Sequence, residues 1–161
     1  MIDILLSATE YEKMKSDTIS FLKDNFVMEI ATCRENKPTV APVIYVIDDD
    51  FNFYFVTYRM SVKAQNLIHN PECALTVWQF LQMCIQVDGV ASVVEDEGKK
   101  EWVMDAFADA ATRDPNFWAP IFRIQRGDYC IFKIKPTWMR TLDLTHNTVR
   151  EEGSPYTEIT L

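Results

Sequence analysis

Histidine and paired cysteines are scarce in this sequence, which limits the metal and redox chemistry that it can support. The chain has two histidines and four cysteines, at positions 33, 73, 84 and 130. No two cysteines form a C-x-x-C pair, so the sequence suggests neither a zinc site nor a redox dithiol. Because three of the four lie in apolar, strand-like runs, we expect buried thiols in a protein of the reducing cytoplasm.

Positive charge is also in short supply. Sixteen Lys and Arg stand against 24 Asp and Glu, for a formal net charge of -8. This balance excludes a general affinity for nucleic acid or for anionic membrane surfaces. Any anion that this protein binds must therefore be held by a local group of residues.

Long apolar runs are missing as well. The apolar run at residues 4–6 is too short for a signal peptide, and Asp3 stands where such a peptide has basic residues. The longest charge-free run, residues 73–87, is interrupted by three glutamines and falls short of a membrane span. With 161 residues, 48% of them hydrophobic, the chain is expected to form one soluble domain with its own core.

The sequence contains runs of apolar residues at the spacings typical of helices and strands. Ser7 and Glu10 fit a capping box, which predicts a first helix that ends near Asn25. Strands are predicted at residues 27–34, 38–47, 51–57, 72–79, 83–94 and 129–134, with a last one at 137–144. Two more helices are predicted, at residues 61–69 and after Gly98, and a loop at residues 112–120.

This order of elements predicts a mainly β fold. Six or seven short strands, mostly consecutive, favour a small antiparallel barrel with helices at its ends. We divide the chain into one domain, residues 1–145, and a polar C-terminal tail, residues 146–161, that contributes little to the core.

Residues 57–71, TYRMSVKAQNLIHNP, contain Arg59 and Lys63 and no acidic residue. Ser61 is a natural N-cap, which leaves Lys63 in the first helical turn, where the helix dipole disfavours a cation unless an anion is present. With the hydroxyl groups of Thr57 and Ser61 and the free amides of the first turn, the segment has the components of a phosphate cradle. The alternative is that Ser61 only caps the helix and that Lys63 is a solvated side chain.

The stretch FYFVTYRMSVKAQNLIHNPECALTVW resembles a known family. Its T-x-x-x-S-x-K pattern, short helix and N-P before a strand are similar to the FMN-binding split barrel of the pyridoxamine 5'-phosphate oxidase-like superfamily, especially its small general-stress-protein-like members. The resemblance covers roughly residues 10–95. It implies a Greek-key-like split barrel, FMN as cofactor, oxidoreductase chemistry on a small organic substrate, and a homodimer with cofactor sites at its interface.

The resemblance also assigns residues to the cofactor site. It places the ribityl phosphate at Thr57, Ser61 and Lys63, with Lys63 as the principal counter-charge. It places the isoalloxazine ring beside the strand at residues 40–45. The implied site consists of Val40, Pro42, Val43, Tyr45, Val56, Thr57, Tyr58, Arg59, Ser61 and Lys63, with Trp78, Gln86 and Trp138 as candidates from the partner chain.

The sequence departs from the authentic oxidases at three points. Ala41 or Pro42 stands where those enzymes have an arginine, and Cys84 falls on the position of their glutamine, with Gln86 two residues away. The segment WMRTLDLTHNTVR lacks their substrate-binding pattern. We therefore do not expect this protein to make pyridoxal phosphate.

Two alternatives to an FMN-dependent oxidoreductase stay open at this stage. One is a non-catalytic stress or sensor protein that holds flavin or haem. The other is a deazaflavin-dependent reductase, whose cofactor needs a wider basic groove than Arg59 and Lys63 offer.

Overall fold

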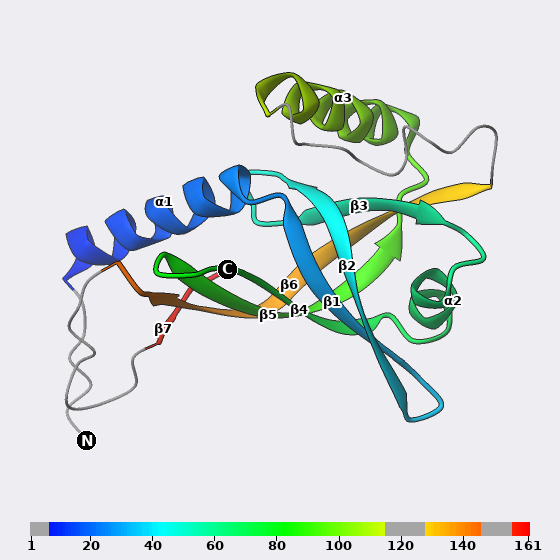
Figure 1. The fold of residues 1–161 in the computed structure, drawn as a ribbon, viewed down its shortest axis with the longest axis horizontal. Coiled ribbons are helices and arrows are strands. Elements are labelled where there is room, and N and C mark those ends of the chain that lie inside the picture. The colour runs from blue at the N-terminus through cyan, green and yellow to red at the C-terminus, as the bar shows by residue number, and fades with distance from the viewer. Residues whose placement is uncertain (1–6, 115–127, 146–155) are drawn as a thin grey trace.

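The computed structural model describes residues 7–114, 128–145 and 156–161, which form a barrel of antiparallel strands with three helices (Figure 1). The strands follow the order β3-β2-β1-β4-β5-β6-β7, and β3 also pairs with β6, which closes six strands into a barrel and leaves β7 outside it. The fold predicted from the sequence is confirmed. The elements are α1 (Ala8–Asp24), β1 (Val27–Arg34), β2 (Lys37–Ile47), β3 (Phe53–Tyr58), α2 (Val62–His69), β4 (Glu72–Gln79), β5 (Met83–Val93), α3 (Glu97–Arg113), β6 (Tyr129–Asp143) and β7 (Thr157–Glu158).

Helix α1 begins and ends where its capping signals predict. The Glu10 amide donates to Ser7 Oγ at 3.3 Å, and the Ser7 amide donates to the Glu10 carboxylate at 2.9 Å, which completes the capping box. Asn25 is the C-cap residue. Phe21 and Leu22 on the inner face of the helix join the barrel core.

The third strand begins two residues later than the sequence predicts. Phe51 has a φ of 61°, and such left-handed backbone cannot continue a strand. Asp48 explains this tight turn, because its carboxylate accepts hydrogen bonds from the Asn52 amide at 2.9 Å and from the Tyr54 hydroxyl at 2.9 Å. β3 therefore starts at Phe53.

The two last strands predicted from the sequence are one strand of 15 residues, β6, so their separation was wrong. Pro136 lies between the two predicted strands, and in the structure it is opposite Gly89, where the register of β5 and β6 shifts by a bulge. On its other side, the pairing of β6 with β3 ends at Ile134. Pro136 thus occupies a position at which a missing amide interrupts neither ladder, as proline in sheets requires.

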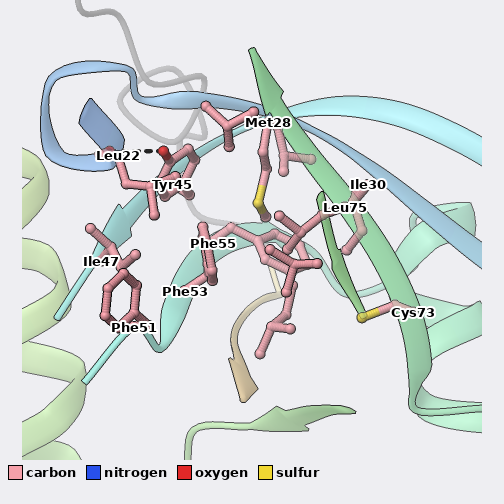
Figure 2. Packing of buried hydrophobic residues seen from close by; sticks show 14 of the residues in the cluster. Leu22, Met28, Ile30, Tyr45, Ile47, Phe51, Phe53, Phe55, Cys73 and Leu75 are labelled. Atoms are coloured by element: carbon pink, nitrogen blue, oxygen red, sulfur yellow. Dashed lines mark hydrogen bonds between the residues drawn. The ribbon is translucent and has the colours of Figure 1, made fainter. Parts of the chain in front are cut away.

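The barrel interior is filled by aromatic and aliphatic side chains (Figure 2). Tyr45 is buried there, and its hydroxyl donates to the Leu22 carbonyl at 2.8 Å, which joins α1 to the sheet. Helix α3 covers a second, smaller cluster on the outside of the barrel, where Val103 and Phe107 pack against Tyr54 and Ile131. The sequence predicts an apolar face of Val103, Ala106, Phe107 and Ala110; the structure buries Val103 and Phe107, whereas Ala106 and Ala110 are only partly buried.

The end of the chain returns to the barrel. β7 pairs with β6, and Ile159, 5% exposed, belongs to the core cluster, so the tail is less purely polar than the sequence indicates. The boundary between a domain at 1–145 and a tail at 146–161 stays a prediction.

Within the described residues, no helix has both the length and the apolar character needed to cross a membrane. Most of the predicted loop at 112–120, including Phe117 and Trp118, lies outside them.

Candidate functional site

The phosphate cradle predicted from the sequence lies at the corner between the end of β3 and the start of α2. Thr57 is buried at this corner, and its Oγ1 lies 3.1 Å from Ser61 Oγ. The Ser61 amide donates to the Tyr58 carbonyl at 2.9 Å, and Gln65 donates its side-chain amide to the Arg59 carbonyl at 2.9 Å. The corner is thus held in one conformation by its own hydrogen bonds.

Ser61 is the N-cap of α2, as predicted. Its Oγ accepts a hydrogen bond from the Ala64 amide at 3.3 Å. The other amides of the first turn, those of Val62 and Lys63, have no acceptor among the described residues. They carry the positive end of the helix dipole and are available to an anion.

Lys63 adds a full positive charge at the same end of α2. The side chain is half-buried, and desolvation lowers its pKa below the ordinary value of 10.5. Within the part of the chain that the structure describes, no acidic group pairs with it. Lys63 is therefore a partly desolvated cation at the end of α2 that carries the free amides.

Arg59 differs from Lys63 because its charge is already compensated. Its Nε lies 3.1 Å from Asp128 Oδ1, and its amide donates to the Asp128 carbonyl at 2.9 Å. The hydrogen bond and charge of Asp128 raise the pKa of Arg59. Lys63 is therefore the principal uncompensated charge of the cradle.

Among the described residues, one edge of β2 lies open beside this corner. β3 pairs with β6 over its whole length but with β2 only at residues 45–47, and beyond that point the ribbons of β2 and β3 diverge (Figure 1). On the other side, the Tyr45 amide donates to the Phe26 carbonyl at 2.9 Å. The alternation of an antiparallel ladder therefore turns the backbone groups of Val40 and Pro42 away from β1, toward the open edge.

The two prolines of β2 fit this open edge. Pro38 and Pro42 both occupy the alternate positions at which an amide would point away from β1, so neither interrupts the β1–β2 ladder. The open edge consequently offers mainly carbonyl acceptors, with an amide donor at Val40. Such groups suit a planar heterocycle with donors and acceptors along its rim.

The remaining predicted residues of β2 and β3 point their side chains to different faces of the sheet. Val43 and Tyr45 point their side chains into the barrel core, and their backbone groups face β1, so neither residue presents hydrogen-bonding groups at the open edge. Val40 and Tyr58 are exposed, whereas Val56 packs against the cluster under α3.

Gln86 and Trp138 do not lie at the cradle of their own chain. Gln86 accepts a hydrogen bond from Arg140 Nε at 2.7 Å, and Trp138 donates to the Glu158 carboxylate at 3.1 Å. Trp138 lies nine residues along β6 from Tyr129, the residue opposite Tyr58, or about 30 Å at the rise of a strand. Trp78 lies exposed near the end of β4, before the β4–β5 turn.

Two residues of this region were not found from the sequence. Asp128, the partner of Arg59, gave no local signal, because 69 residues separate the two. Asn66 is a buried polar residue between Ala64 and Leu67 on the inner face of α2, and that break in an apolar face is a signal that could have identified it.

The corner and the open edge of β2 offer two different kinds of ligand-binding group. The cradle supplies Lys63, two unpaired amides and two hydroxyls for a phosphate, and the open edge of β2 supplies backbone groups for a ring. A cofactor that carries both a ring and a phosphate would use both features.

Most of the chain matches one known protein family. Residues 15–143 match a family model described as pyridoxamine 5'-phosphate oxidase. No curated protein sequence matches the chain significantly.

Three solved structures share the fold at low sequence identity. General Stress Protein 26 from Bacillus anthracis is 22% identical, with a TM-score of 0.62 over 80% of this chain and 92% of its own. The haem storage protein HutZ from Vibrio cholerae is 20% identical, with a TM-score of 0.56 over 75% and 88%. An FAD-binding protein from Mesorhizobium loti is 19% identical, with a TM-score of 0.59 over 84% and 92%.

Proposed function

The chain belongs to the pyridoxamine 5'-phosphate oxidase family, and from that premise we propose that it is an FMN-binding flavoprotein that acts as an oxidoreductase on a small organic substrate. The observation that carries the proposal is Lys63, a half-buried and uncompensated cation at the N-terminus of α2. A dianionic phosphate is the ligand that best matches a lysine, two hydroxyls and two free amides.

Each group has a distinct part in holding the cofactor. Lys63 and the amides of Val62 and Lys63 would bind the phosphate, and whichever of the paired Thr57 and Ser61 hydroxyls keeps a free proton would donate it to the phosphate. The backbone of Val40 and Pro42 would meet the ring edge. The flavin supplies the redox chemistry, and the protein positions it and limits its contact with water.

We propose further that two copies of the chain form the complete site. Apolar side chains surround the cradle, with Tyr58 48%, Met60 63% and Val62 64% exposed. Exposed apolar residues grouped beside a polar site are typical of an interface. Sedimentation equilibrium with and without FMN tests this, and a monomer that binds FMN with full affinity would contradict it.

The visible absorption spectrum of the purified protein tests the proposed cofactor. After addition of excess FMN and removal of unbound material, the bands of an oxidised flavin should remain with the protein. A retained haem band, or retention of a deazaflavin instead of FMN, would replace the proposed cofactor with that ligand.

Replacing Lys63 tests the residue that carries the proposal. Lys63→Glu should weaken FMN binding by about a hundredfold or more, because a charge-assisted bond is lost and a repulsion is added. Lys99→Glu is the matched control, since Lys99 lies in the first turn of α3, away from the cradle. Unchanged FMN affinity in Lys63→Glu would show that the phosphate lies elsewhere.

Catalysis needs its own test. Steady oxidation of a nicotinamide cofactor in the presence of an electron acceptor would support an oxidoreductase. A tightly held flavin that no physiological donor reduces would instead support the non-catalytic stress or sensor protein.

A further inference from the structure

A triangle of three polar side chains fastens α2 to the β1–β2 hairpin. Asn66 donates its two side-chain amide hydrogens to Thr32 Oγ1 and Thr39 Oγ1, each at 3.0 Å. The two hydroxyls lie 3.0 Å from each other, because Thr32 and Thr39 are directly opposite in the β1–β2 ladder. All three corners of the triangle are thus hydrogen-bonded to the other two.

The directions of these bonds follow from the chemistry of the groups. Asn66 uses both donors, so each threonine oxygen accepts one hydrogen bond. Thr32 is 2% exposed and has no other acceptor in the triangle, so its proton goes to Thr39. Thr39 is exposed, and its own proton is free to point outward beside the open edge of β2.

The triangle joins the two halves of the proposed cofactor site. Asn66 lies one helical turn after Lys63, so a hydrogen bond at Asn66 fixes the position of the cradle. Thr39 directly precedes Val40, so the same bond fixes the open edge. An apolar side chain at residue 66 would fill the space but would let the helix slide or rotate against the hairpin, because apolar contact is not directional.

We infer that Asn66 is a positioning residue that sets the spacing between the phosphate cradle and the ring-binding edge of β2. The inference rests on the proposed FMN-binding function and adds to it a residue that touches neither end of the cofactor. Its effect should therefore appear only for a ligand that has both ends.

FMN and riboflavin together provide the test, since they share the ring and differ in the phosphate. In Asn66→Leu, the ratio of the riboflavin Kd to the FMN Kd should fall about tenfold, a coupling typical of residues in one network. The riboflavin Kd itself should change by less than about twofold. Thr39→Val, which removes one corner of the triangle and leaves the Asn66–Thr32 hydrogen bond in place, should lower the same ratio by a smaller factor.

A double-mutant cycle separates positioning from a general loss of stability. When Lys63→Met has already removed the charged part of the phosphate contact, Asn66→Leu should raise the FMN Kd by a smaller factor than it does in the wild type. The matched control is Asn70→Ala on the same helix, since Asn70 also binds β1, through the Cys33 carbonyl at 3.1 Å, but at the end far from the cradle. That variant should leave the ratio unchanged.

Two results would overturn the inference while leaving the proposed function intact. One is an equal loss of FMN and riboflavin affinity in Asn66→Leu, and the other is an additive effect with Lys63→Met. A wild-type protein that binds neither flavin would overturn the proposed function, and the inference with it.

Discussion

The position of Lys63 lowers the stability of the protein when no ligand is bound. A cation in the first turn of a helix opposes the helix dipole, and partial burial removes some of its hydration. Both effects disfavour the charged side chain until an anion is bound. Such a residue trades stability of the free protein for affinity.

Lys63→Met should therefore stabilise the unliganded protein. Relief of about 0.3–1 kcal/mol is expected for removing a cation from the first turn, or a rise in Tm of about 1–3 °C for a chain of this size. With saturating FMN the order should reverse, because only the wild type gains stability from tight binding. Thermal unfolding with and without FMN measures both, and a destabilised empty variant would show that Lys63 has a structural role instead.

The pH dependence of that difference follows from the pKa of Lys63. The folded-state pKa lies below the unfolded value of 10.5, so folding disfavours the charged lysine at neutral pH. As the pH rises from the folded-state pKa to above 10.5, the lysine loses its proton first in the folded state and then in the unfolded state. Above 10.5 it is neutral in both states, and its penalty on the free energy of unfolding disappears. The stability gap between Lys63→Met and the wild type should shrink over that window, as urea unfolding at neutral and alkaline pH would measure.

At residue scale, the sequence correctly predicted Ser61 as the N-cap of α2, because that signal is local. Thr57, Ser61 and Lys63 lie within seven positions, and a cap followed by a lysine is visible in the sequence. Prediction failed for Asp128 and for Asn66 with its partner Thr32, because 69 and 34 residues separate those contacts. Such pairs depend on strand register, which a short pattern does not fix.

At the scale of elements, the β5–β6 bulge explains why one long strand tolerates a proline. Gly89 faces Pro136 at the register shift. A Cβ at Gly89 would lie 2.7 Å from Ile134 Cγ2 and 3.0 Å from the Lys135 carbonyl oxygen, and the second of these is backbone that cannot rotate away. The glycine is therefore required by close approach of the two strands.

Gly89→Ala should destabilise the protein by about 1–3 kcal/mol, the usual cost of inserting a carbon into a packed interior. Urea denaturation monitored by tryptophan fluorescence measures the change. Gly98→Ala is the opposite case, because its Cβ would meet only Asp96 Oδ1, at 3.5 Å, and alanine favours the helix α3 by up to about 1 kcal/mol. Equal stability of the two variants would contradict the role given to the bulge.

For the whole molecule, the open edge of β2 is a consequence of how the barrel closes. β3 pairs with β2 at three residues and with β6 at six, so β3 leaves the neighbour that precedes it in the chain and closes the barrel on the other side. Strand patterns predicted both partners as strands, but they did not predict where the pairing of β3 with β2 ends. That point, and with it the position of the ring-binding edge, depends on contacts between residues more than 70 positions apart, such as Phe55 with Phe132.

The C-terminal strand β7 pairs with β6 outside the closed barrel, and we expect its contribution to the free energy of unfolding to come mainly from Ile159, the residue that follows it. The Ile159 amide donates to the Met139 carbonyl at 2.9 Å, and its side chain is 5% exposed in the core, whereas Leu161 is 53% exposed. Ile159→Ala should cost about 2–5 kcal/mol, as for other buried isoleucines, and Leu161→Ala less than about 0.5 kcal/mol. Urea unfolding of both variants measures the difference. If Ile159→Ala unfolded like the wild type, β7 would contribute nothing to stability, and residues 1–145 would be sufficient for the fold.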